Sequence, residues 1–292
     1  MVKYNPKAWI GLVFHAYSSH VIKTLWPMLS FMVAFAALVC YLILDFFKLQ
    51  PHEFQGSTTV HSLLGIVLGL FLVFRTNSAY ERWWEGRKMW GGIVNSTRNL
   101  ALKLNAYLGT EHQSEREWFS RMIPNFVFAM KEHLRSGVMI GELDIPEKEF
   151  FDELKLVKHK PNKISSGLYK RVNQLYLNKT FTGDQLINLD KELKDFIDII
   201  GACERIKSTP IPYSYSMFIK KFIFIYLVTL PFGFVSTFGY VTIPIVILIS
   251  FILLSVELIA EEIEDPFGKD VNDLPTDELA GRIKDNIKEI LA

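Results

Sequence analysis

Acidic side chains gather near the C-terminus in a pattern that could hold a cation. The residues are Glu257, Glu261, Glu262, Glu264 and Asp265. Carboxylate oxygens are the ligands that Ca²⁺ prefers, although an ordinary solvated helix end would carry the same residues. Negative charge near the C-terminal end of a helix is not favoured by the helix dipole. We therefore expect basic partners from another segment, such as Arg75 or Arg82.

Bulky apolar residues recur at every fourth position of an uncharged segment, as Ile66, Leu70 and Phe74. In a helix these side chains stack along one face. A column of this kind can narrow an aqueous pore and gate it by dewetting. A stripe that faces lipid or a neighbouring helix has the same pattern, so periodicity alone leaves both interpretations open.

Charged and aromatic residues alternate directly after this column, over residues 74–88. Arg75 follows the last apolar ring and can extend to lipid headgroups. Trp83 and Trp84 must bury a large area against another surface. The segment is therefore either an interfacial belt that anchors the helix or a functional element.

Motifs of enzymes are absent from the sequence. It lacks the glycine-rich nucleotide loops, the HExxH and GxSxG motifs and a Cys-x-x-Cys pair. The seven histidines are scattered, and His15 and His20 are five residues apart, which places them on different faces of a helix. We expect no catalytic residue and no metal active site. The net charge of +1 offers no basic excess for nucleic acid.

Apolar segments at both ends of the chain are long enough to span a membrane. The runs 25–44 and 55–74 carry no charge, and about 20 helical residues cross a hydrocarbon core. No charge occurs between Lys221 and Glu257 either, which is too long for one span. Because prolines and glycines interrupt that run, we expect a hairpin of two spans, 217–238 and 241–260.

Basic residues near the spans predict the orientation. Arginines and lysines follow the second span and precede the third, whereas the loop between the first two spans contains only Lys48. By the positive-inside rule, both termini and the central region face the cytosol. The expected organisation is a cytosolic N-terminal segment, two spans, a cytosolic domain, two more spans and a cytosolic C-terminal segment, with bounds 1–24, 25–74, 75–216, 217–260 and 261–292.

The central region is expected to be helical. Helical spacing without proline continues from Arg75 to Leu108, which predicts one long helix that continues the second span. Thr182 is expected to open a later helix. The stretch 158–167 contains proline, asparagine, serine and glycine, so we expect a loop there.

Three stretches together resemble the bacterial branch of the bestrophin family: RTNSAYERWWEGRKMWG at 75–91, GACERIKSTPIPYSYS at 201–216 and EEIEDPFG at 261–268. Their order and spacing match the family over nearly the whole chain. The motif positions are Arg75, Asn77, Tyr80, Arg82, Trp83, Trp84, Glu85, Asp265, Pro266, Phe267 and Gly268.

This resemblance implies an all-α membrane protein with four transmembrane helices and a helical cytosolic domain. It also implies a homopentameric ion channel in the bacterial inner membrane, with a pore on the five-fold axis and no cofactor. Ile66, Leu70 and Phe74 would then form the neck of the pore. Ile187, counted back from Cys203, would form a constriction at the cytosolic exit. The partners implied are other copies of the chain, the lipid bilayer and permeant monovalent ions.

One departure concerns calcium. Animal bestrophins carry an unbroken acidic run after Pro-Phe-Gly that clasps Ca²⁺, whereas Lys269 and Val271 interrupt the run here. Asp270 and Asp273 are the remaining calcium candidates, and with fewer oxygen donors the affinity should fall steeply. We therefore expect gating that is independent of Ca²⁺.

The permeant ion is either a cation or an anion. Apolar rings set a barrier but not the sign of the ion, and the bacterial character favours monovalent cations over chloride. A secondary transporter would call for inverted repeats and ionisable residues at mid-membrane, and a non-conducting scaffold is a further alternative.

Overall fold

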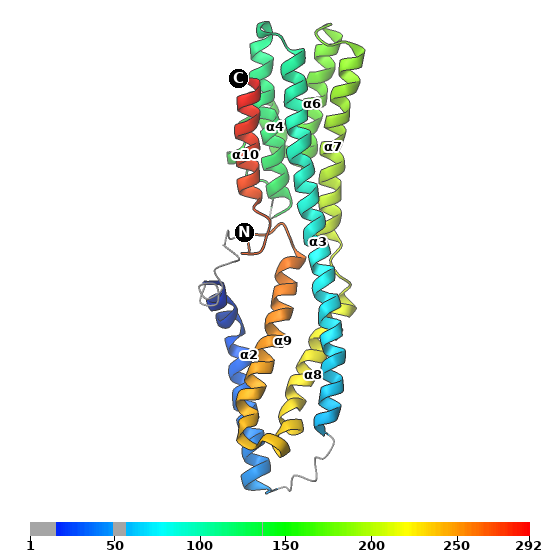
Figure 1. The fold of residues 1–292 in the computed structure, drawn as a ribbon. Coiled ribbons are helices and arrows are strands. Elements are labelled where there is room, and N and C mark those ends of the chain that lie inside the picture. Colours follow the sequence, from blue (N-terminus) through cyan, green and yellow to red (C-terminus); the bar gives the residue numbers. More distant parts are fainter. Residues whose placement is uncertain (1–15, 49–56, 136) are drawn as a thin grey trace. The chain divides into compact units, whose positions relative to one another are not determined.

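The computed structural model describes residues 16–48, 57–135 and 137–292, and every regular element within these ranges is a helix. The chain divides into two compact units (Figure 1). The first, here called the apolar unit, comprises the described residues up to Arg82 together with Pro210–Glu264. The second, here called the charged unit, comprises the described residues of Trp83–Thr209 together with Asp265–Ala292. Helix α3 (Ser57–Tyr107) contributes to both.

The apolar unit is made of long helices. Besides the first part of α3, it contains α2 (Ala16–Tyr41), a π-helical turn η1 (Leu42–Phe46), α8 (Tyr213–Phe238), a 3₁₀ turn η5 (Gly239–Val241) and α9 (Thr242–Glu264). Three segments of the described chain are long and apolar enough to cross a membrane: His20–Phe46, Thr58–Tyr107 and Tyr213–Glu264. The last of these contains both α8 and α9. The break expected within the uncharged run is present at Gly239, whose φ of 53° favours glycine.

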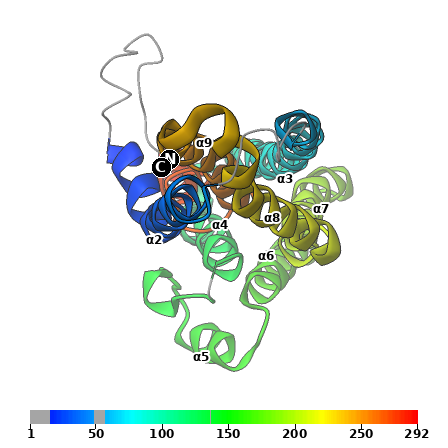
Figure 2. The ribbon, with the colours of Figure 1, turned by 90° about the horizontal axis from the view of Figure 1, so that it is seen from below.

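Side chains from all four of these helices form the core of the apolar unit. Helices α2 and α8 both pack against α9 (Figure 2). The buried residues are Met32, Ala36, Leu68, Leu72, Ile219, Ile223, Tyr226, Leu227, Leu230 and Val246. Many other large apolar side chains of these helices remain exposed. An apolar surface of this extent is what a lipid-facing or subunit-facing protein requires.

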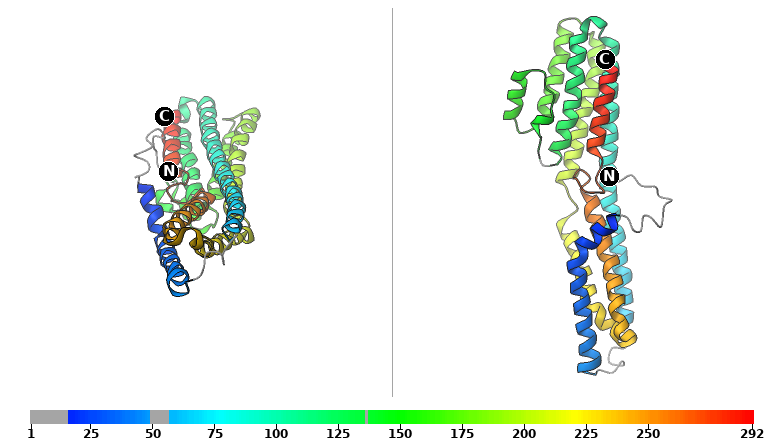
Figure 3. Two further views of the ribbon diagram at one scale, coloured as in Figure 1. Left: turned by 60° about the horizontal axis from the view of Figure 1, so that its bottom comes forward. Right: turned by 90° about the vertical axis from the view of Figure 1, so that its left-hand side faces the viewer.

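The charged unit is a helical bundle. Besides the second part of α3, its main helices are α4 (Gln113–His133), α6 (Lys160–Leu177), α7 (Gly183–Ser208) and α10 (Thr276–Leu291). The short α5 (Lys148–Leu156) lies to one side of this bundle (Figure 3). Two short 3₁₀ turns, η3 (Thr110–His112) and η4 (Ile140–Glu142), complete it. Large buried side chains such as Trp90, Phe119, Phe126 and Phe196 fill its core.

Two expectations about helices in this region are confirmed. Helix α3 runs for 51 residues without a proline, so the segment after the apolar column does continue the same helix. Thr182 is the N-cap of α7. Its hydroxyl accepts a hydrogen bond from the backbone of Gln185, whose side chain in turn accepts one from the backbone of Thr182. This reciprocal pair satisfies two otherwise unpaired N–H groups.

The loop expected at 158–167 is wrong, because α6 begins at Lys160 and includes the rest of that stretch. The side chain of His159 caps the helix by accepting a hydrogen bond from the backbone of Asn162 at 3.2 Å. Pro161 falls in the first turn, where a missing N–H costs nothing. Close packing leaves no room for a side chain at Gly167, because a Cβ there would lie 2.9 Å from the ring of Phe150.

Asp277, in the first turn of α10, fixes this helix to α4. Its carboxylate accepts hydrogen bonds from the guanidinium of Arg135 at 2.7 and 3.0 Å and lies 2.9 Å from the ammonium of Lys131. The hydrogen bonds from Arg135 hold the pKa of Asp277 well below its usual range. A carboxylate with a lowered folded-state pKa stabilises the fold above its ordinary pKa of about 3.9, and that stabilisation is lost as the pH falls further.

We therefore expect Asp277→Asn to destabilise the protein at pH 7 by about 1 kcal/mol, a modest effect because water screens this exposed carboxylate. The difference from wild type should shrink as the pH falls below about 4. Thermal unfolding in detergent at several pH values measures both effects. Asp152→Asn, which removes an exposed pair with Lys155, is the matched control. A deficit of the same size at pH 7 and at low pH would contradict the assignment.

Candidate functional site

The apolar column of α3 is exposed in the single chain. Ile66, Leu70 and Phe74 expose 71%, 56% and 53% of their surface. The opposite side of the same helix is buried at Leu68 and Leu72, which belong to the core of the apolar unit. The column is therefore not part of the core of this chain, and the packing interpretation within one chain is excluded. Lipid, water or another copy of the chain must cover it.

A buried ion pair anchors α3 immediately beyond the column. Arg75 is 1% exposed, and its Nη2 lies 2.7 Å from Oε2 of Glu264 on α9. Its Nε lies 3.6 Å from Oε1 of Glu257, which is 6% exposed. The other oxygen of the Glu264 carboxylate accepts a hydrogen bond from the backbone of Ile211. Arg82 donates to the backbone carbonyl of Glu264 at 3.2 Å.

The acidic cluster of α9 therefore has the basic partners expected from the sequence. Arg75 is shared by Glu257 and Glu264, Lys220 donates to both oxygens of Glu261 at 3.1 Å, and His20 lies 3.4 Å from Glu262. Carboxylates that are distributed among such partners do not form a cation site. Their role is to hold the helices of the apolar unit together.

The remaining motif residues of α3 separate into buried and exposed positions. Trp83 packs against the core of the charged unit, and its Nε1 donates to the carbonyl of Asn272 at 2.9 Å. Glu85 lies 3.6 Å from Arg205. Tyr80 and Trp84 are about half exposed, at 53% and 48%, and Asn77 is exposed as well. The large buried area expected for Trp84 is therefore not found within this chain.

The Pro-Phe-Gly segment packs closely on α3. Phe267 is 1% exposed, and a Cβ at Gly86 would lie 3.1 Å from Pro266 and 3.2 Å from the ring of Phe267. The absence of a side chain at Gly86 thus makes room for Pro266 and Phe267. Asp265 is exposed, and one of its oxygens accepts a long hydrogen bond of 3.4 Å from the backbone of Phe267.

The calcium candidates lie in the turn after Gly268. Asp273 is 2% exposed, and its Oδ2 accepts a hydrogen bond from the backbone of Asp270 at 2.6 Å, while its Oδ1 has no partner. Burial, with smaller contributions from the carboxylates of Asp270 and Asp265, raises the pKa of Asp273 to about 6. Asp270 itself is exposed. One free buried oxygen and one exposed carboxylate are a poor donor set for an ion that takes six to eight oxygens.

Ile187 projects from the first turns of α7 and is 69% exposed. The buried face of α7 carries Leu189, Leu193, Phe196, Ile200 and Cys203. Burial raises the pKa of Cys203 to about 12, so its thiol is an inert core group. The exposed isoleucine has no role in the core of the single chain.

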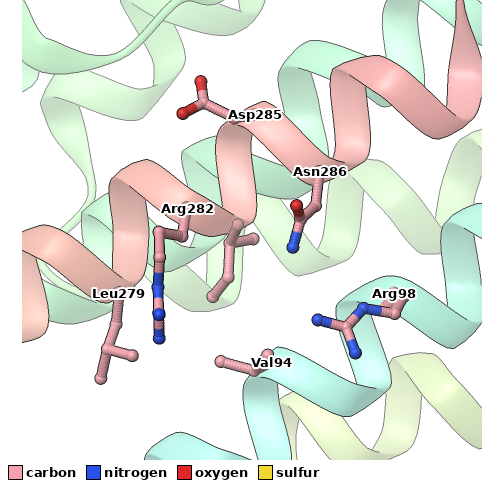
Figure 4. Close-up of a pocket in the computed structure, with 7 residues that line it drawn as sticks. Val94, Arg98, Leu279, Arg282, Asp285 and Asn286 are labelled. Atoms are coloured by element: carbon pink, nitrogen blue, oxygen red, sulfur yellow. The ribbon is translucent and has the colours of Figure 1, made fainter.

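A pocket of about 390 Å³ between α3 and α10 was not expected from the sequence (Figure 4). Arg282 and Asn286 extend from α10 toward α3, where Val94 and Arg98 lie, whereas Asp285 points away. None of the site residues inferred from the sequence lines it. The two arginines are far apart in the chain, so only the packing of α10 on the bundle reveals that they are neighbours.

Comparisons with known proteins agree with this arrangement. Residues 1–289 match the family model described as bacterial/fungal bestrophin protein. A voltage-dependent anion channel-forming protein of Nostoc is 39% identical over 231 residues, which are 77% of this chain and 75% of that protein. A voltage-dependent anion channel-forming protein of Salmonella typhi is 27% identical over 290 residues, which are 97% of this chain and 92% of that protein.

Solved structures give the same result for the fold. A crystal structure of a bacterial bestrophin homologue from Klebsiella pneumoniae superposes with a TM-score of 0.81 and 26% identity, and the match covers 90% of this chain and 97% of that chain. A further crystal structure of that homologue superposes with a TM-score of 0.82 and covers 92% of this chain and 99% of that chain. The all-helical fold, its apolar helices and the matched sequence place this chain in the bacterial and fungal bestrophin family of ion channels.

Proposed function

We propose that the protein is a passive ion channel, assembled as a homopentamer in the bacterial inner membrane. Its four spans would be α2, the first part of α3, α8 and α9, with both termini and the charged unit in the cytosol. The membership of an ion-channel family and the three long apolar segments support this proposal, since the third segment folds into two helices at Gly239. An enzymatic activity is not proposed.

The neck of the pore would be formed by five copies of the column of Ile66, Leu70 and Phe74. The observation that carries this proposal is that α3 exposes these residues while Arg75, the next residue along, is buried in an ion pair. In a pentamer each exposed side chain becomes one of five in a ring, and stacked apolar rings make a dewetting gate. Ile187, exposed near the start of α7, would form the second constriction.

The first charged residue beyond the column on the same face of α3 is Glu81, which favours cations. Glu81 lies seven residues after Phe74, so the two side chains point in nearly the same direction from α3. Glu81 is exposed. Five such carboxylates would surround the ion path next to the neck, where their fields add. We therefore propose a preference for small monovalent cations.

Anion conduction is the second candidate, because similar proteins are named voltage-dependent anion channel-forming proteins. Reversal potentials in asymmetric NaCl across a planar bilayer distinguish the two. A reversal potential shifted toward the sodium equilibrium potential supports our proposal. A reversal potential near the chloride equilibrium potential establishes the anion channel. Purified protein without any conductance would favour a scaffold, and saturable, gradient-coupled flux would favour a transporter.

Neutralising Glu81 tests the source of the selectivity. A unit charge about 7 Å from an ion contributes ~0.6 kcal/mol in water, and in the proposed pentamer five would act together. Even after screening by salt, we expect Glu81→Gln to lower the permeability ratio of sodium over chloride at least about fivefold. Glu111→Gln, which removes an exposed carboxylate from the charged unit, is the control and should leave the ratio unchanged. An unchanged ratio in Glu81→Gln would remove this residue from the ion path.

Calcium is not expected to control this channel. With one free oxygen on Asp273 and an exposed Asp270, the turn after Gly268 supplies too few donors for tight binding. Replacing millimolar calcium by a chelator should change neither the bilayer current nor the midpoint of thermal unfolding. A large effect of calcium on the current or on the unfolding midpoint, if it were lost in Asp273→Asn, would show that this turn does bind calcium.

A further inference from the structure

Two histidines and one glutamate from three separate elements of the charged unit converge on one point. His133 is the last residue of α4, His159 caps the start of α6, and Glu204 lies in the last third of α7. Nε2 of His133 and Nε2 of His159 each lie 2.7 Å from Oε1 of Glu204. The two imidazole rings are 4.5 Å apart between centroids.

This cluster has no part in the conduction proposed above. Two imidazoles from distant parts of the chain are directed at the same Glu204 oxygen. Two imidazole nitrogens and one carboxylate oxygen are the protein ligands of many zinc sites, which complete their tetrahedron with water. The three side chains are 27%, 32% and 36% exposed, so an ion and a water can reach them from solvent.

We propose that His133, His159 and Glu204 bind a divalent transition-metal ion of the zinc class. The ligand atoms all lie within 4.8 Å of one another. Around a tetrahedral ion with bonds of about 2.0–2.1 Å, neighbouring ligand atoms lie roughly 3.3 Å apart. The two nitrogen–oxygen distances must therefore open by about 0.6 Å from their hydrogen-bonded values, which side-chain rotation provides without moving the helices.

Metal binding would change the tautomer of His159. Nδ1 of His159 accepts a hydrogen bond from the backbone of Asn162, so the neutral ring carries its proton on Nε2, toward Glu204. A metal at Nε2 requires the tautomer that is protonated on Nδ1. The cap of α6 then opens, with no net gain or loss of protons by this ring. Metal binding would thus join α4, α6 and α7 and loosen the first turn of α6.

The N-cap role of His159 suggests a variant that removes the metal ligand and keeps the cap of α6. Asparagine is a strong N-cap residue, so His159→Asn removes the metal ligand and retains an acceptor for the Asn162 amide. Glu204→Gln keeps a side chain of the same shape. His112→Asn is the matched control, because His112 is a surface histidine beside a glutamate, Glu111, at 3.9 Å.

The experiment is calorimetric titration of the purified full-length protein in detergent with ZnCl₂, with MgCl₂ as the hard-cation comparison. We expect one zinc per chain and no comparable magnesium binding, with affinity at least about tenfold weaker in His159→Asn and Glu204→Gln but unchanged in His112→Asn. Cobalt substitution should give the intense visible absorption of a tetrahedral site. Hydrogen exchange at Asn162 should become faster when zinc is added to the wild type.

Two results would overturn the proposal. One is the absence of stoichiometric zinc binding in wild type, which would leave a hydrogen-bonded cluster. The other is zinc binding of equal affinity in wild type and His159→Asn, which would place the ion elsewhere. Neither result depends on ion conduction, so the channel function is tested separately.

Discussion

Replacing Ile66, Leu70 and Phe74 together by alanine is expected to raise ion flux through reconstituted liposomes at least about tenfold, which corresponds to a barrier lowered by ~1.4 kcal/mol. The reason is that, in the proposed pentamer, alanine would remove three stacked apolar rings at once, so that water could occupy the neck continuously. Flux is measured as the decay of an ion gradient at equal protein content, with the oligomeric state checked before reconstitution.

The chain offers a control of identical composition. Phe224, Leu248 and Ile252 are exposed to 49%, 60% and 51% on α8 and α9. Replacing these three by alanine removes the same side chains from a different part of the apolar surface and should leave flux unchanged. Equal flux in the wild type and in the variant of Ile66, Leu70 and Phe74 would mean that the column faces lipid or a neighbouring helix.

Replacing Arg75 by methionine is expected to produce the largest loss of stability, about 3–5 kcal/mol, because the buried carboxylate of Glu257 and the partly buried carboxylate of Glu264 lose their shared partner. The methionine retains most of the volume and removes only the charge. Thermal unfolding of the detergent-solubilised protein measures the loss. Arg205→Met breaks an exposed pair with Glu85 and should cost at most about 1 kcal/mol.

A double substitution identifies the cause of that loss. If unpaired carboxylates are responsible, then Glu257→Gln combined with Arg75→Met should recover part of the stability, because a neutral amide is less costly to bury than a charge. Strict additivity of the two single effects would show that Arg75 acts through packing alone.

The sequence predicted the fold of this chain well where local signals are strong. The hydropathy of the apolar runs, the break at Gly239 and the cap at Thr182 depend on residues close together in the chain, and the structure contains each. The pairing of Arg75 with Glu264 was also predictable, because several carboxylates at a helix end call for a basic partner.

Other features depend on contacts that no local pattern reveals. The helix at 160–177 was missed because its cap is a histidine, outside the common set of capping residues. His133, His159 and Glu204 are far apart in the sequence, so their convergence appears only in the folded bundle. Trp84 and the apolar column are exposed in one chain, and no pattern along the sequence specifies what covers them.

The adjacency of Phe74 and Arg75 limits how such a gate can move. Successive side chains of a helix point about 100° apart, so one turns outward while the next lies between two carboxylates. Rolling α3 about its own axis would withdraw the guanidinium from Glu264 and expose an unmatched charge to an apolar interior. In the proposed pentamer, the ring of phenylalanines would therefore change width by rotamer changes, or by α3 and α9 tilting as one rigid pair. Rotation of α3 alone about its axis would break this ion pair and is therefore energetically costly.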